Sequence, residues 1–242
     1  MALRFNNTLN DRATFSGEAG LGSSNTHTTL VWFRREANDT GAEVLVLSTA
    51  TSTYQLKLTA TGIQTYSALG ASGSAAQSLN TYYCLALVRN AALFSAYQWD
   101  TTGARTDIAV NLDSTISNNC TSLRMGDSGG AYTAPRASYR YLRHWSRALS
   151  LAELLAEVQF TPTGTGAGAA ASTTNLRGSW PLSDATDTTD WSGNSNTLTI
   201  NSGSTSSDEP SIPAGGASAA ISPSILRPNQ STVFGSAAQR FT

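Results

Sequence analysis

Short apolar runs recur roughly every ten residues through the first half of this chain, and turn residues separate them. Runs of this length, rich in Val, Leu, Tyr and Trp and bounded by Gly, Asn and Asp, are typical of β-strands. The clearest runs are residues 28–36, 43–47, 54–58, 82–89, 93–99, 106–112 and 121–126. Strands at this spacing predict two antiparallel sheets packed face to face. We therefore expect an all-β jelly-roll sandwich.

The sequence makes more detailed predictions for several of these strands. Residues 3–16 predict an opening strand pair with Asn10 in its turn, and residues 54–58 alternate as one sheet face against solvent. Residues 82–89 and 93–99 predict a hairpin. Residues 178–182 and 196–200 predict two late strands, and the sequence leaves open which sheet they join.

One helix interrupts the β pattern, between residues 149 and 158. Ser150 followed by Glu153 has the spacing of a capping box, and Leu149 and Leu154 have the spacing of a hydrophobic staple. The apolar stripe predicted for this helix is Leu151, Leu154, Leu155 and Val158. The strand before it carries Tyr139, Tyr141 and Trp145 at even spacing, which predicts that they share one face.

The segment HWSRALSLAELLAEV (144–158) resembles the end of a laminin-G-like domain of the concanavalin A-like superfamily. Four other segments resemble that family in the expected order: 28–36, 82–90, 122–130 and 178–200. The resemblance spans residues 1–201 and implies a concanavalin A-like jelly roll. The family includes glycan binders, adhesion modules, enzyme appendages and virion proteins, so the resemblance implies no single function.

The composition of the chain argues against two classes of partner, nucleic acids and membranes. Charged residues make up 13% of the chain and the net charge is −1, which indicates neither nucleic-acid nor membrane-surface binding. The N-terminal residues lack the apolar core of a signal peptide, and no stretch is long enough to insert into a membrane. We therefore expect cytoplasmic synthesis followed by incorporation into a virus particle, with an extracellular protein as the alternative.

The last part of the chain differs from the rest. After residue 201, Ser, Gly, Pro and Ala dominate, but large apolar residues return near the end without helical spacing. We divide the chain into a sandwich (1–201) and an extended C-terminal arm (202–242) that packs on a neighbouring subunit or on its own domain. The apolar residues expected to anchor this arm are Ile221, Ile225, Leu226, Val233, Phe234 and Phe241.

No catalytic constellation or cofactor site emerges. The carboxylates are scattered rather than paired, and Ser128 in GDSGG lacks a protease context, so we expect a protein that is not an enzyme. Cys84 and Cys120 are expected to be buried thiols, with a disulfide left open.

Two kinds of ligand remain as alternatives. Calcium is one, with no assigned ligand set; the loop candidates are Asp11, Asp113, Asp127, Asp184, Asp187 and Asp190. We expect Asp190 to cap its own turn. A glycan is the other, and the aromatic residues considered for it are Tyr97, Trp99, Tyr132 and Trp191, for each of which packing is the competing role.

These observations together predict a structural or adhesive virion component, specifically a bacteriophage capsid decoration protein that assembles as a homo-oligomer. The low charge and the apolar-anchored arm favour this hypothesis. The alternative is a carbohydrate-binding or receptor-binding module, in a tail fibre or a secreted adhesin.

Overall fold

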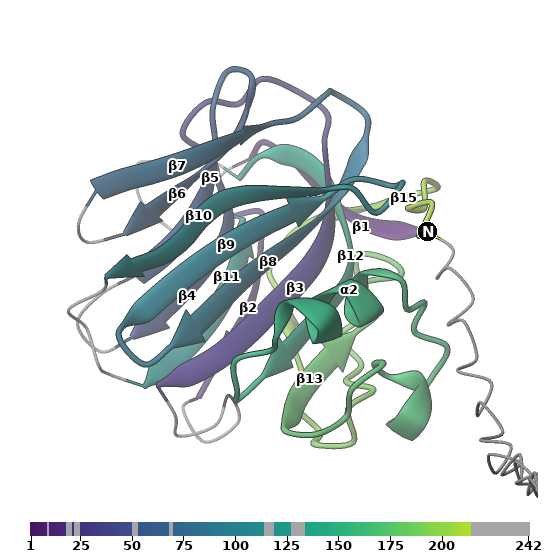
Figure 1. Cartoon of the computed structure of the whole chain (residues 1–242). Helices are drawn as coiled ribbons and strands as arrows, with labels where there is room; N and C mark the ends of the chain where they lie inside the picture. Colours follow the sequence, from purple (N-terminus) through teal and green to yellow (C-terminus); the bar gives the residue numbers. More distant parts are fainter. Residues whose placement is uncertain are drawn as a thin grey trace, which may run out of the picture.

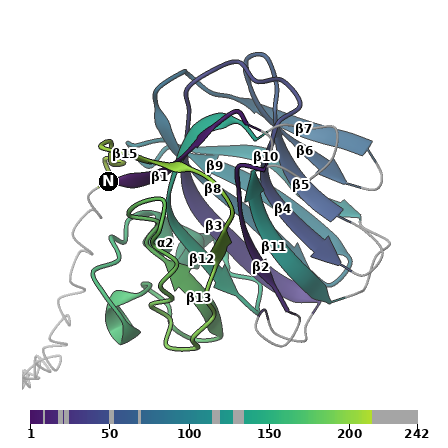
Figure 2. The same cartoon turned by 180° about the vertical axis from the view of Figure 1, so that it is seen from behind.

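The computed structural model describes residues 1–8, 10–17, 21, 25–49, 53–67, 70–113, 119–126 and 134–213. Two antiparallel sheets pack face to face and form a jelly-roll sandwich (Figures 1 and 2). The predicted fold class is therefore confirmed.

The first sheet contains eight strands. Seven of them follow the order β10 (Arg105–Asp113), β9 (Leu93–Trp99), β8 (Tyr82–Asn90), β3 (Thr26–Arg35), β12 (Arg136–Trp145), β1 (Ala2–Asn6) and β15 (Ser204–Ser206). The eighth strand, β13 (Leu176–Trp180), also pairs with β12. The second sheet has the order β14 (Thr199–Ile200), β2 (Arg12–Ser16), β11 (Cys120–Gly126), β4 (Glu43–Thr49), β5 (Thr53–Leu58), β6 (Gly62–Ser67) and β7 (Gly70–Ala76).

The main core lies between the two sheets. Within the first sheet, the ring of Tyr139 on β12 lies 5.1 Å from that of Phe5 on β1. Across the two sheets, the ring of Tyr54 on β5 lies 5.1 Å from that of Phe94 on β9. Such pairs add to the stabilisation that burial of their apolar area already supplies. As predicted, β3 is buried on both faces, because a second core covers its other side.

That second core lies on the outer face of the first sheet, the face turned away from the second sheet. Helix α2 (Leu151–Val158), the short 3-10 helix η1 (Gly166–Gly168) and the segments around them cover Trp32, Trp99 and Trp145 there (Figure 1).

The capping box of α2 is confirmed. The Ser150 side chain accepts from the backbone N–H of Glu153, and the Glu153 carboxylate accepts from that of Ser150. Leu149 and Leu154, the predicted staple pair, lie in the second core.

The predicted apolar stripe of α2 is wrong in two of its four members. Leu154 and Val158 are buried, but Leu151 and Leu155 are 43% and 39% exposed, and Glu157 is buried instead. The helix turns a carboxylate inward because an arginine of β12 lies beneath it.

The predicted common face of Tyr139 and Tyr141 is also wrong. Arg140 pairs with Trp32 and Arg143 with Leu30, so the register of β12 shifts against β3 between these two pairs. Tyr141 has a φ of 52° at this β-bulge. A bulge shifts the alternation of the side chains, so Tyr139 lies in the main core and Tyr141 in the second core.

The predicted opening strand pair is not formed. β1 joins the first sheet beside β12 and β15, whereas β2 joins the second sheet beside β11 and β14. The late strands divide in the same way, with β13 in the first sheet and β14 in the second. The hairpin of β8 and β9 is formed as predicted.

The solvent-facing side predicted for residues 54–58 is largely covered. Gln55 and Lys57 are 8% and 7% exposed. The Lys57 ammonium lies 3.9 Å from a carboxylate oxygen of Glu43 and 4.5 Å from the centre of the Tyr66 ring.

The segment assigned to the arm begins within the sandwich. Ser204–Ser206 pairs with β1 as β15, and the chain is described as far as Pro213. The predicted anchors Ile221, Ile225, Leu226, Val233, Phe234 and Phe241 lie outside the described residues.

Candidate functional site

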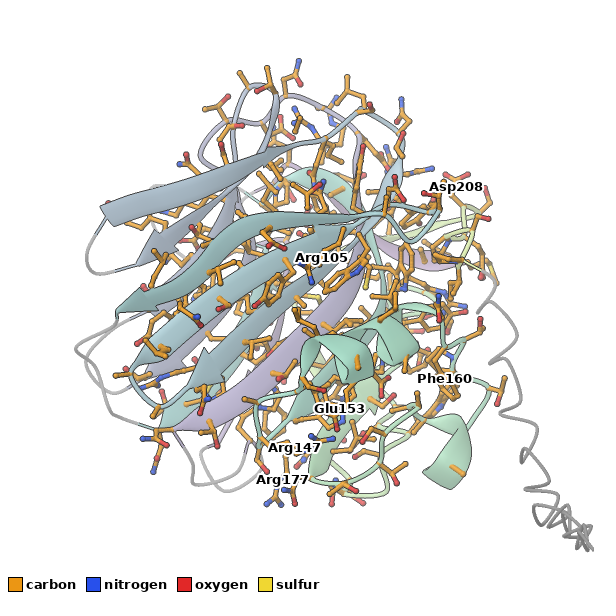
Figure 3. The ribbon with its side chains drawn as sticks, in the orientation of Figure 1. Arg105, Arg147, Glu153, Phe160, Arg177 and Asp208 are labelled. Carbon is orange, nitrogen blue, oxygen red and sulfur yellow. The ribbon has the colours of Figure 1, made fainter. Side chains whose placement is uncertain are left out.

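Side chains with functional potential gather on the outer face of the first sheet, around α2 and the last described residues. Figure 3 shows Glu153 on α2, Arg147 close to it and Asp208 at the corner near β15. Three features share this face: a buried ion pair under the helix, a terminal strap with a polar pocket beside it, and an exposed apolar strip.

The buried ion pair joins Arg143 of β12 to Glu157 of α2, and both side chains are fully buried. The second guanidinium nitrogen of Arg143 donates to the Glu157 carbonyl at 2.9 Å, and the Glu157 carboxylate also accepts from the backbone N–H groups of Ala171 and Ser172 at 3.2 and 2.6 Å. Burial raises the pKa of Glu157 and lowers that of Arg143, while the opposite charge of each partner counteracts its shift. The pair fixes the helix and the following loop to the sheet.

The terminal strap, which we define as residues 204–213, is held by charges at its middle. Asp208 pairs with Arg34 of β3 at 2.6 Å, and Glu209 pairs with Arg140 of β12 at 3.0 Å and with the amino group of Met1. The Tyr82 hydroxyl donates to the Asp208 carbonyl at 3.3 Å. The hydrogen bond from Arg34 lowers the pKa of Asp208.

Beyond these ion pairs the strap continues over the outer face. Ile212 packs against the second core. A Cβ placed on Gly103, in the turn between β9 and β10, would lie 3.7 Å from Pro213. The last described residue therefore lies beside one end of the β9–β10 hairpin.

A polar pocket of about 410 Å³ lies beside the strap. Charged and hydroxyl-bearing side chains line it: Arg4, Arg34, Glu36, Asn80, Thr205, Ser206, Ser207 and Asp208. Glu36 accepts from Arg4 at 2.8 Å, from Arg34 at 2.7 Å and from the Ser138 hydroxyl at 2.8 Å. Burial acts to raise the pKa of Glu36, but these hydrogen bonds outweigh it and the pKa is lowered.

The apolar strip, which we define as Leu93, Val110, Leu151 and Leu155, lies at the opposite end of the hairpin. Their exposed fractions are between 39% and 46%. Leu93 and Leu151 both line a groove of about 220 Å³. The other residues that line the groove are all uncharged: Val88, Asn90, Ser95, Tyr97, Asn111, Ala148, Leu149 and Ser150.

A β-bulge in β10 shapes this groove. Ala109 pairs with Ala96 and Leu112 with Phe94, so Val110 and Asn111 together stand opposite Ser95. Asn111 has a φ of 50°, and its backbone N–H donates to the Ser95 hydroxyl at 3.0 Å. The bulge thus brings Asn111 to the groove, as bulges next to binding sites often do.

Three of the four aromatic residues considered as ligand-facing, Tyr97, Trp99 and Trp191, are engaged in packing. Trp99 is 2% exposed and Tyr97 8%, and their rings lie 5.9 Å apart. Trp191 is half-buried against the second core. Tyr132 lies outside the described residues.

The predicted calcium candidates hold their own loops together. The Asp190 carboxylate accepts from the backbone N–H groups of Ser179, Ser192 and Asn196 at 2.8–2.9 Å, so it caps its turn as predicted. Asp184, Asp187 and Asp11 accept similar bonds from neighbouring residues. Within the described ranges, no three His, Cys, Asp or Glu side chains are arranged to hold a metal ion. The structure describes the backbone but not the side chain of Asp113, and Asp127 lies outside the described ranges.

Cys84 and Cys120 are both buried free thiols. Burial raises the pKa of each, that of Cys120 to about 12.

His27 and His144 form a second buried polar group. Their ring centres lie 5.8 Å apart, and the Nδ1 atom of His144 lies 2.7 Å from the Thr29 hydroxyl. Ser128 lies outside the described residues. In the part of the chain that the structure covers, no helix has the length and apolar character needed to span a membrane.

No protein-family model and no curated protein matches this chain. Among solved structures, the native heptameric SAP-like pentraxin of Limulus polyphemus is similar to it, with a TM-score of 0.50 and 14% sequence identity. The match covers 84% of this chain and 94% of the pentraxin chain. It supports the jelly-roll sandwich over most of the chain and, at this identity, shows the fold alone.

Two glycoside hydrolases are also similar over part of their length. The sialidase of Trypanosoma rangeli in complex with 2,3-difluorosialic acid matches with a TM-score of 0.49 and 16% identity, over 62% of this chain and 26% of the sialidase. A GH43 protein of Bacillus licheniformis matches with a TM-score of 0.41 and 12% identity, over 52% of this chain and 28% of that protein. This chain thus corresponds to about a quarter of either enzyme.

These matches correct the expectation that the protein is not an enzyme. Glycoside hydrolases are among its structural neighbours, so the scattered carboxylates did not justify excluding the enzyme class. The likeness is confined to the fold and transfers no catalytic residue to this chain.

Proposed function

We propose that this protein is a structural or adhesive component of a larger assembly, built on a laminin-G-like sandwich. The most specific form of this proposal is a bacteriophage virion protein that decorates the capsid as a homo-oligomer. In this proposal the sandwich is the body of each subunit, and the C-terminal residues fasten it to its neighbours.

The observation that carries the proposal is the terminal strap. Asp208 and Glu209 fasten it to two strands of the first sheet, and Pro213 rests beside Gly103. The chain that follows carries six large apolar residues, and it starts beside the β9–β10 turn, just after the ion-paired part of the strap. An attachment arm needs such a defined origin, because a defined origin limits the volume that its apolar residues explore and raises their effective concentration at a nearby partner.

The test compares the mass in solution of the full chain and of a chain ending at Pro213. The shorter chain retains the strap and every described strand of both sheets. We expect a homo-oligomer for the full chain and a monomer for the shorter one, with equal thermal stability of the monomer unit. Monomers in both cases would refute the proposal.

Carbohydrate binding is the second candidate, and the polar pocket favours it. Hydroxyl, amide and guanidinium groups converge there in a volume of about 410 Å³, a lining suited to sugar hydroxyls. The test is a titration with a panel of neutral and sialylated oligosaccharides, using Asn80→Ala as the pocket variant. Binding that this variant weakens would support the candidate, and no binding by either protein would refute it.

A further inference from the structure

The apolar strip is an exposed surface without a described partner. Leu151 and Leu155 lie one turn apart on α2, and Leu93 of β9 lines the same groove as Leu151. Val110 of β10 is the fourth exposed apolar residue of the strip. Exposed apolar side chains that line a groove, as Leu93 and Leu151 do, often mark an interaction site. The groove between Leu93 and Leu151 carries no charged residue, so its occupant should be apolar and uncharged.

The chain itself contains a segment of this character. Residues 221–226, with the sequence Ile-Ser-Pro-Ser-Ile-Leu, hold three large apolar side chains and no charge. Pro223 favours an extended backbone for itself and for the residue before it. We propose that residues 221–226 bind in the groove of the same subunit, with Ile221, Ile225 and Leu226 packed against the apolar strip.

The strap places the segment within reach. Pro213 lies at the β9–β10 turn, and the groove lies near the other end of β9, at Leu93. Six residue steps of β9, from Trp99 to Leu93, span about 20 Å, whereas eight extended steps from Pro213 to Ile221 span about 26 Å. A tether only slightly longer than the gap gives a high effective concentration, which favours binding within one subunit over binding to another copy.

The groove also has partners for an extended backbone. Asn90 and Asn111 are exposed at its edge, and each side-chain amide offers donors and an acceptor to peptide groups. The bulge in β10 brings Asn111 to the groove at the cost of a left-handed backbone, which is the kind of local strain found at binding sites.

This inference rests on the proposed function, since it names the surface that receives the first half of the attachment arm. It leaves Val233, Phe234 and Phe241 to contact a neighbouring subunit. If residues 221–226 are bound in the groove, the free part of the arm begins after residue 226. It then starts beside α2 rather than at the β9–β10 turn.

The test is disulfide trapping in the full chain with Leu151→Cys and Ile225→Cys, equilibrated in a glutathione buffer. The control pair is Tyr66→Cys with Ile225→Cys, because Tyr66 has a similar exposure of 40% but belongs to the second sheet. Cys84 and Cys120 do not interfere, since both are buried. We expect a cross-linked monomer with an effective concentration at least about tenfold above that of the control pair.

Two results would overturn the inference. Equal trapping of the two pairs would mean that the segment does not bind the groove. Cross-linked dimers, formed when one chain carries only Leu151→Cys and the other only Ile225→Cys, would mean that the occupant comes from a second copy. Neither result decides the proposed function, which the mass of the chain ending at Pro213 tests separately.

Discussion

Removing one partner of the Arg143–Glu157 pair should strongly destabilise the fold. Both side chains are fully buried, so Glu157→Gln leaves a guanidinium without a counter-ion inside the second core, and Arg143→Met leaves a carboxylate. Loss of one partner from a buried pair costs about 3–5 kcal/mol, because the remaining charge keeps its desolvation penalty. For a chain of this size, such a loss lowers the melting temperature by about 6–20 °C.

The double variant separates the charge effect from packing. If the cost arises from an unpaired buried charge, combining Arg143→Met with Glu157→Gln should restore about 2 kcal/mol relative to the sum of the single losses. The amide carbonyl that Glu157→Gln introduces could still accept from the backbone N–H of Ala171 or Ser172, so the loop after the helix keeps part of its support.

The measurement is urea unfolding of the four proteins, extrapolated to water at constant m-value. The exposed pair Arg105–Asp107 is the internal control: its atoms are 2.7 Å apart, but the two side chains are 39% and 41% exposed. Asp107→Asn should cost at most about 1 kcal/mol. A loss for Glu157→Gln no larger than that of Asp107→Asn would refute the reasoning.

Three further predictions concern the cap, the strap and the buried histidines. Ser150→Ala should cost about 1 kcal/mol in urea unfolding, because the first turn of α2 loses its cap, and no loss would argue against it. Asp208→Asn should change global stability by less than about 1 kcal/mol but increase amide exchange in the strap, since Asp208 is half exposed; unchanged exchange would show that the Arg34 pair does not hold it. Burial lowers the pKa of His144 to about 4 and that of His27 well below 6.5, so the unfolded state takes up their protons first. Stability should therefore fall as the pH drops from about 6.5 towards 4, by up to about 1.4 kcal/mol per unit for each histidine, and His144→Asn should flatten that slope.

Local patterns predicted the elements that local interactions specify. The Ser150–Glu153 capping box and the β8–β9 hairpin depend on residues close in sequence, and both are present as expected. The alternation of residues around Tyr141 predicted the wrong face for that side chain. The reason is a β-bulge, which depends on pairing with a strand more than a hundred residues earlier. No spacing rule within β12 could place Tyr141 on the opposite face.

The candidate site was harder to predict because a second core covers the outer face. Trp99 resembles an exposed platform in sequence, yet the chain after residue 150 packs over the outer face around it. The inward position of Glu157 was not predicted for the same reason. The Glu157 carboxylate points towards the sheet because Arg143 lies beneath the helix. Glu157 directly precedes the apolar Val158 and lies three residues after Leu154, and Arg143 stands in the preceding strand; this combination is the one signal that could have suggested it.

The position of β1 bears on the order in which this protein folds. β1 lies between β12 and β15, whose pairing residues, such as Tyr139 and Thr205, leave the ribosome more than a hundred positions later. Until those segments are synthesised, the edges of β1 have no native partner in the first sheet. Contacts between such distant segments slow folding, because long loops must close before they are stabilised. β2 waits in the same way for β11 and β14. The first two strands to leave the ribosome are therefore among those that need protection from aggregation during synthesis.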